Sequence, residues 1–165
     1  MTATHGPGRA PANGERRTAW LLVLGQFFLL GLIVLVPHGH AWTVPAAVGR
    51  VTQVAAGVGI VVMLVAGATL GRGLTAAPLP NARAVLRTGG LYRLVRHPIY
   101  SGLLLLSLAL TLTSASLWIL SAYTALVVLI NVKARWEERH LERRFTDYAA
   151  YVARTPRFLP RLVRH

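Results

Sequence analysis

Long apolar runs dominate the hydropathy pattern of the chain. Residues 19–36 are interrupted only by Gln26 and stop at Pro37, and residues 51–70 carry no charged side chain. A helix that crosses the hydrocarbon core of a bilayer needs about 20 residues. The pattern therefore predicts two transmembrane helices in the first half of the chain. The second run contains three small residues, Gly57, Gly59 and Gly67. They indicate close packing of the helix against a neighbour, not a nucleotide-binding loop.

The next apolar run, residues 98–132, is uncharged over its whole length. Two full crossings would need roughly 40 residues, and the small polar stretch 113–116 lies near the middle of the run. The pattern predicts a hairpin of two short or tilted helices. This hairpin either crosses the bilayer or re-enters it from one side.

The C-terminal part of the chain changes from a continuous apolar pattern to a periodic one. Over residues 135–152, helical spacing predicts an amphipathic helix with one apolar stripe, formed by Leu141, Phe145, Tyr148 and Val152. Glu137 and Glu138 flank this stripe, and a solvated interfacial helix would account for them without a functional role. The expected fold class is all-α: a polytopic membrane helical bundle with about four membrane segments and a C-terminal amphipathic helix.

Composition and charge agree with a membrane protein. The chain is 54% hydrophobic and only 14% charged, whereas soluble domains carry about 25% charged residues. Its 18 Lys and Arg against 5 Asp and Glu give a formal charge of +13. Because the basic residues lie between apolar runs, we expect them to face anionic membrane lipids, not nucleic acid. The absence of cysteine excludes disulfides, thiolate metal sites and a Cys nucleophile, and no metal site is expected from the histidines.

The distribution of basic residues predicts the orientation. Only Arg50 lies in the loop between the first two predicted helices, so the positive-inside rule places both termini in the cytoplasm. Residues 1–18 are rich in Gly, Pro and Ala and predict a disordered cytoplasmic tail. A cleavable signal peptide is the alternative, but the apolar run 19–36 is longer than the apolar segment of a usual signal peptide. We expect a multi-pass protein of the bacterial inner membrane.

A dense group of chemically active side chains lies where the basic loop 72–96 enters the membrane. It comprises Tyr92, Arg93, Arg96, His97 and Tyr100. Interfacial anchoring and a helix start at the following proline would explain these residues structurally. Ionisable groups at membrane depth are nevertheless functional-site candidates by default.

Taken in order, these motifs resemble the isoprenylcysteine carboxyl methyltransferase family, a group of integral-membrane methyltransferases related to phospholipid N-methyltransferases. The resemblance covers residues 83–160. It rests on Tyr92-x-x-x-Arg96-His97-Pro98-x-Tyr100-x-Gly102, the apolar hairpin, Glu137-Glu138 and the ending Pro156-Arg157-Phe158-x-Pro160. Residues 19–165 would then form one membrane methyltransferase domain.

The resemblance implies S-adenosylmethionine as methyl donor at the cytoplasmic face and a lipophilic acceptor that enters from the bilayer. By the same resemblance, Lys133 or Arg135, with Arg96 as a further candidate, would hold an anionic acceptor. An amine acceptor would first have to lose a proton, which His97 or a glutamate could take. The residues lining the cofactor site would be Ala84, Val85, Leu86, Arg87, Tyr92, His97, Pro98, Ile99, Tyr100 and Glu137, with Glu138 as the less favoured alternative to Glu137.

The acceptor and the oligomeric state stay open. A prenylcysteine-type carboxylate, another isoprenoid-like acid, a phospholipid amine and a small thiol are all compatible with the motifs. An NADPH-dependent membrane reductase of the sterol type and a non-catalytic polybasic scaffold are the alternatives from other classes. The Arg96-His97-Pro98-x-Tyr100 element and Glu137-Glu138 favour the methyltransferase.

Overall fold

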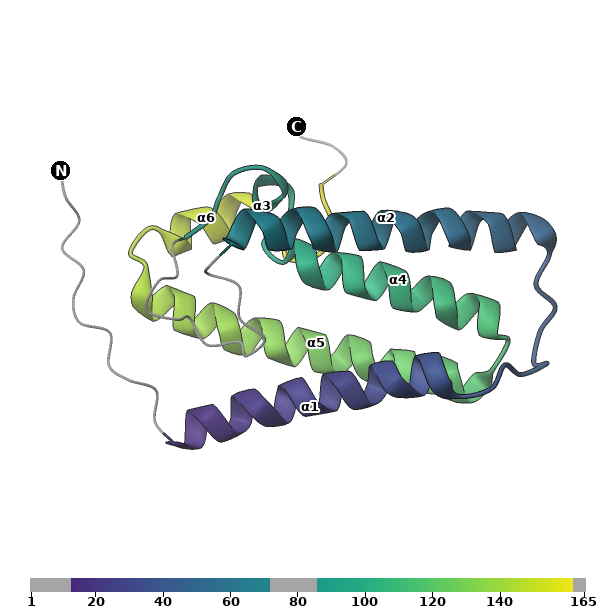
Figure 1. Ribbon diagram of the computed structural model, residues 1–165. Coiled ribbons are helices and arrows are strands. Elements are labelled where there is room, and N and C mark those ends of the chain that lie inside the picture. Colours follow the sequence, from purple (N-terminus) through teal and green to yellow (C-terminus); the bar gives the residue numbers. More distant parts are fainter. Residues whose placement is uncertain (1–12, 72–85, 162–165) are drawn as a thin grey trace.

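The computed structural model describes residues 13–71 and 86–161. The regular structure of these residues is helical (Figure 1). No strand occurs within those residues. The helices are α1 (Asn13–Leu35), α2 (Ala46–Leu70), α3 (Leu91–Leu94), α4 (Pro98–Ser114), α5 (Leu117–Arg144) and α6 (Tyr148–Arg154). The predicted all-α class is confirmed.

Three helices, α1, α2 and α5, are long and apolar enough to cross a membrane. The fourth apolar helix, α4, has 17 residues and is therefore about 25 Å long, shorter than a hydrocarbon core of about 30 Å. The predicted hairpin forms, because α4 and α5 are antiparallel and joined at Ala115 and Ser116 (Figure 1), but only α4 is short, since α5 has 28 residues. The chain is thus a multi-pass membrane protein with three to four candidate spans.

Close contact between two glycines brings α2 and α4 together, side by side in Figure 1. A Cβ atom built on Gly59 would lie 2.7 Å from the carbonyl oxygen of Gly102, and one on Gly102 would lie 2.6 Å from that of Gly59. The packing role predicted for the small residues of α2 holds for Gly59, whereas Gly57 faces open space. Because Gly102 lies just after the start of α4, this contact also places the first turn of α4.

A strap formed by residues 37–45 ties the end of α1 to the turn between α4 and α5. The backbone amide of Gly39 donates to the Ser114 carbonyl at 2.8 Å, and that of Ala41 donates to the Ala115 carbonyl at 2.8 Å. Ala115 has a left-handed backbone (φ 49°). A side chain on Gly39 would come within 2.6 Å of the Ala115 carbonyl oxygen, so the close crossing requires glycine.

The second helix pair, α1 and α5, packs through a core of buried side chains, namely Ile33, Ile119, Ala122, Leu126 and Ile130. At the opposite end from the strap, the carboxylate of Glu15 lies 3.4 Å from His140 Nε2 and 3.9 Å from Arg143 Nη1. The start of α1 and the end of α5 are therefore fastened together. Large apolar side chains on the outer faces of α1 and α2 stay exposed, as expected of surfaces that face lipid.

The predicted boundary between the N-terminal tail and the first helix was wrong. Helix α1 begins at Asn13, so residues 13–18 of the predicted disordered tail are helical, and the remainder of that tail lies outside the described residues. Glu15 in the first turn favours this extension, since an acidic side chain stabilises a helix N-terminus.

The predicted single amphipathic helix over residues 135–152 does not form. Its first part continues α5 without a break, and the chain leaves the helix at Phe145, which has an extended backbone (φ −120°, ψ 114°). The polar pair Thr146 and Asp147 then turns the chain into α6, since such residues compete with helical hydrogen bonding. The break lets α6 bury Tyr148 and Tyr151 against the bundle.

A candidate active site at the polar end of the bundle

The first turn of α4 is clamped by the C-terminal segment that follows α6. The backbone amide of Arg96 donates to the Pro156 carbonyl at 2.9 Å, and that of His97 donates to the Arg157 carbonyl at 3.1 Å. The hydroxyl of Ser101 donates to the Phe158 carbonyl at 2.7 Å. These bonds fix the backbone on both sides of Pro98 and so position the His97 side chain.

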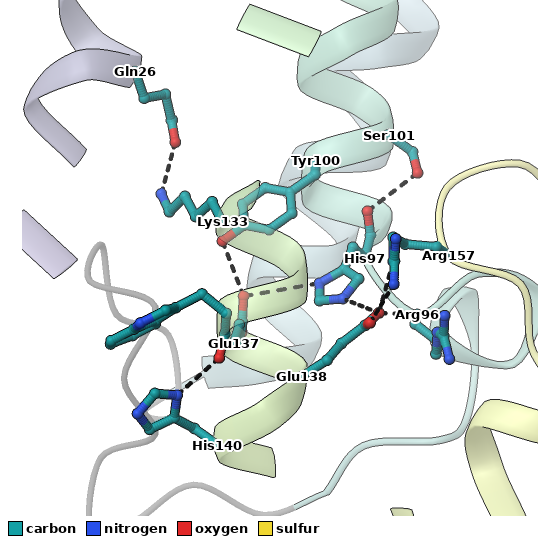
Figure 2. A network of polar contacts seen from close by, with 11 residues as sticks. Gln26, Arg96, His97, Tyr100, Ser101, Lys133, Glu137, Glu138, His140 and Arg157 are labelled. Carbon is teal, nitrogen blue, oxygen red and sulfur yellow. Dashed lines mark hydrogen bonds and ion pairs between the residues drawn. The ribbon is translucent and has the colours of Figure 1, made fainter. Parts of the chain in front are cut away.

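Glu138 of α5 is the central anion of the site (Figure 2). Its side chain is only 9% exposed, and Arg157 donates to both of its oxygens, at 3.0 Å from Nε and 2.6 Å from Nη2. His97 Nε2 lies 3.1 Å and Arg96 Nη2 lies 3.3 Å from the same carboxylate. A buried carboxylate is stable only with such partners, so Glu138 joins α5, α4 and the C-terminal segment.

Glu137, the neighbouring residue on α5, faces a different group. Its Oε2 accepts a hydrogen bond from the Tyr100 hydroxyl at 3.0 Å and lies 3.8 Å from His97 Nδ1. Within the described residues its other oxygen, Oε1, makes no hydrogen bond, and the side chain is 29% exposed. Glu137 is therefore better placed than Glu138 to accept a hydrogen bond from a ligand.

The rings of His97 and Tyr100 stack at a centroid distance of 5.3 Å and an interplanar angle of 11°. His97 also contacts the ring of Phe158 at 6.0 Å. His97 thus lies between two carboxylates and two aromatic rings. This surrounding is suited to a cationic ligand group, which both carboxylates and ring faces attract.

Lys133 lies one helical turn before Glu137 and is 3% exposed. Its ammonium group donates to Gln26 Oε1 of α1 at 2.6 Å and lies 5.3 Å from the centroid of the Tyr100 ring (Figure 2). The polar contacts therefore continue from the C-terminal segment into the apolar part of the bundle.

The tyrosines of α3 and α6 connect these short helices to each other and to α2. The hydroxyl of Tyr92 donates to the Ala66 carbonyl of α2 at 3.4 Å, and the hydroxyl of Tyr151 donates to the Tyr92 carbonyl. Burial raises the pKa of Tyr151 to about 12 and also raises the pKa values of Tyr92 and Tyr148. All three phenols stay protonated at neutral pH, and those of Tyr92 and Tyr151 act as hydrogen-bond donors.

The structure brings six of the predicted site residues into one network: Arg96, His97, Tyr100, Lys133, Glu137 and Glu138. Others lie outside it. Arg135 is exposed, Tyr92 is bonded to α2, and Pro98 and Ile99 belong to the first turn of α4. Leu86 and Arg87 are in an irregular segment before α3. Ala84 and Val85 lie outside the described residues.

Sequence reasoning missed four members of the network, namely Gln26, Ser101, Arg157 and Phe158. Arg157 and Phe158 carried a signal, because they belong to the quoted C-terminal motif. Gln26 also carried one, as the residue that interrupts the first apolar run. Ser101 had no signal that separates it from an ordinary helical serine.

Comparison with known proteins agrees with this architecture. Residues 51–148 match the family described as phospholipid methyltransferase. The chain is also similar to the cobalt-zinc-cadmium resistance protein CzcN of Cupriavidus metallidurans, with 38% identity over 78 residues. That similarity covers 47% of this chain and 36% of CzcN, so the chain matches only about a third of that protein's length.

The matched residues 51–148 run from α2 to the first residue of α6. They include His97, Tyr100, Lys133 and the Glu137-Glu138 pair, and they leave out α1 and the segment that carries Arg157. The predicted family is confirmed only at a coarser level, as the phospholipid methyltransferase family to which it is related. The chain belongs to the phospholipid methyltransferase family.

Proposed function

We propose that the protein transfers a methyl group from S-adenosylmethionine to a lipophilic acceptor with an anionic head group, such as a prenylcysteine-type carboxylate. The observation that carries the proposal is the arrangement around Tyr100. Glu137 accepts a hydrogen bond from its hydroxyl, the His97 ring stacks on its ring, and the Lys133 ammonium lies 5.3 Å from the ring centroid. One region attracts cations and the other attracts anions.

The residues at the Glu137 side fit the cofactor. S-adenosylmethionine has a cationic sulfur, an ammonium group and ribose hydroxyls, all of which a carboxylate can attract or accept hydrogen bonds from. Glu137 has an oxygen for such a bond, whereas both oxygens of Glu138 already bind Arg157. The Tyr100 ring can add a cation–π attraction of about 0.5–2 kcal/mol. The backbones of Leu86, Arg87 and Ile99 stay candidates for further contacts.

When bound, the cofactor supplies an electrophilic methyl group on its cationic sulfur. The protein's own residues then have to hold the acceptor in line and exclude water. A carboxylate acceptor is already a nucleophile, so this reaction needs no general base. His97 would be needed as a base only for an amine acceptor.

Among the predicted acceptor-binding cations, Lys133 is the best placed. Arg135 is exposed. Arg96 is paired with Glu138, although its Nε and Nη1 are buried without a hydrogen-bond partner in the described residues, so it stays a candidate for an anionic group of either ligand. Lys133 is buried and lies toward the apolar part of the bundle, where it contacts Gln26 of α1.

The proposal is tested by calorimetric titration of the detergent-purified protein with S-adenosylmethionine, S-adenosylhomocysteine and NADPH. We expect saturable binding of the first two ligands and a loss of at least tenfold in affinity for Glu137→Gln. Glu142→Gln is the matched control, because this carboxylate is on the exposed side of α5. Binding of NADPH alone would favour a reductase. Binding of none of the three by the folded protein would favour a scaffold, and either result would overturn the proposal.

A further inference from the structure

Gln26 contributes to the site from a helix that lies outside the family match at residues 51–148. It is the polar interruption in the apolar run of α1. Its side-chain oxygen accepts a 2.6 Å hydrogen bond from Lys133, which is 107 positions away along the chain. A polar side chain at this depth is unfavourable unless it serves packing or function, and here it makes a specific contact with a charged group of the site.

The position of the Lys133 ammonium group requires such a partner. Side chains on a helix lean toward its N-terminus, and the N-terminus of α5 lies at the end of the bundle opposite the site. Lys133 therefore points away from the polar end of the bundle. A lysine near a membrane surface usually extends in the opposite sense, toward water. Gln26 and the Tyr100 ring hold the ammonium group in this inward position (Figure 2).

The amide group of Gln26 has a chemical property that matters for this role. It accepts the hydrogen bond of Lys133 without adding a charge, so the Lys133 ammonium keeps its attraction for an anion. Its own NH₂ group makes no hydrogen bond within the described residues and can donate to the same anion. A carboxylate at position 26 would accept the same bond but would neutralise the ammonium group and repel an anion.

We infer that Gln26 is a specificity-determining residue that positions Lys133 to recognise an oxyanion on the head group of the acceptor. This inference rests on the proposed function, because it assigns the head-group end of that site. The oxyanion is either a carboxylate or a phosphate ester. Since α1 is not part of the family match, Gln26 provides a means of selecting the head group that is separate from the shared methyltransferase core.

The test compares three single-chain amphiphiles of equal chain length: tetradecanoate, tetradecyl phosphate and tetradecyltrimethylammonium. Each competes with radiolabelled tetradecanoate for the full-length protein in phosphatidylcholine nanodiscs. We expect Gln26→Glu to weaken binding of both anions at least tenfold and to leave binding of the cation unchanged or stronger. The stronger of the two anions in the unmodified protein identifies the carboxylate or the phosphate as the preferred head group.

The matched control is Gln53→Glu, which places the same new charge on an exposed position of α2 and should change neither anion nor cation binding. Gln26→Leu removes the hydrogen bond without adding charge and should weaken anion binding by about threefold to tenfold. This variant keeps the inference testable if Gln26→Glu does not fold. Equal anion binding by the unmodified protein and the folded Gln26 variants would overturn it, as would an equal loss for anions and the cation.

The proposed function and this inference fail in different ways. Calorimetric binding of S-adenosylmethionine together with anion binding that ignores Gln26 would overturn the inference and keep the proposed function. Anion binding that depends on Gln26, without any binding of S-adenosylmethionine, would support the oxyanion site and overturn the methyltransferase assignment of the pocket.

Discussion

The glycine contact between α2 and α4 gives the sharpest test of how packing determines the site. In Gly59→Ala the new methyl carbon would start 2.7 Å from the Gly102 carbonyl oxygen and 3.0 Å from the Leu106 nitrogen. Ordinary contacts of a methyl group are about 3.5 Å or longer, so the two helices must separate by about 1 Å. Gly57→Ala is the matched control, because a side chain at that position meets nothing within 4 Å.

Comparing the two variants isolates the packing effect. Replacing a helical glycine by alanine improves helix propensity by about 1 kcal/mol at either position, and this gain cancels in the difference. The remaining difference is the cost of overpacking, about 1–3 kcal/mol. For a protein of this size, each kcal/mol shifts the unfolding midpoint by about 2–4 °C. The midpoint of Gly59→Ala should therefore be about 2–12 °C below that of Gly57→Ala.

The same displacement should reach the candidate active site. Gly102 lies one turn after Pro98, so a shift of about 1 Å in α4 displaces His97 and Tyr100 and should weaken the binding of S-adenosylmethionine. Thermal unfolding followed by tryptophan fluorescence measures the first effect, and calorimetric titration with S-adenosylmethionine measures the second. Equal unfolding midpoints and equal affinities in Gly57→Ala and Gly59→Ala would refute the reasoning.

Two further predictions concern the groups around the site. Arg157→Met removes two charge-assisted hydrogen bonds to Glu138, and such bonds contribute about 1.5–3 kcal/mol. The variant should therefore lower the unfolding midpoint clearly more than the exposed control Arg154→Met. Equal midpoints would contradict this role of Arg157. The pKa of Tyr151 is raised from 10.0 to about 12, so its contribution to folding stability is complete below pH 10 and is lost as the pH rises toward 12. Chemical unfolding at pH 8 and pH 11 should show a smaller loss of stability in Tyr151→Phe than in the unmodified protein, and parallel losses would argue against burial of the Tyr151 hydroxyl.

Most of the helical architecture could be predicted from the sequence, because long uncharged runs have few stable arrangements other than membrane helices. The continuation of α5 into the charged residues 133–144 could not. In sequence, the change from apolar to charged composition marks the start of a separate interfacial helix. In the structure, α5 remains helical past this change because Lys133 and Glu138 are buried against α1, α4 and the C-terminal segment.

The candidate site could be predicted in composition but not in its pairings. Glu137 and Glu138 are about 100° apart around the helix axis, so each faces a different neighbour. The sequence does not show that Arg157 faces Glu138 or that Tyr100 faces Glu137. The contact between Gln26 and Lys133 joins distant segments, and neither hydropathy nor spacing of motifs contains information on such pairs.

The clamp between Glu138 and the C-terminal segment has a consequence for the order of biosynthesis. Glu138 is synthesised 19 residues before Arg157, the residue that binds both of its oxygens. Until Arg157 has been translated, the network offers this carboxylate only His97 and Arg96 as partners, and the first turn of α4 lacks its backbone bonds to residues 156 and 157. Membrane insertion of the helices therefore precedes completion of the site. A nascent chain would acquire a competent pocket only after residues 156–158 have docked on α4.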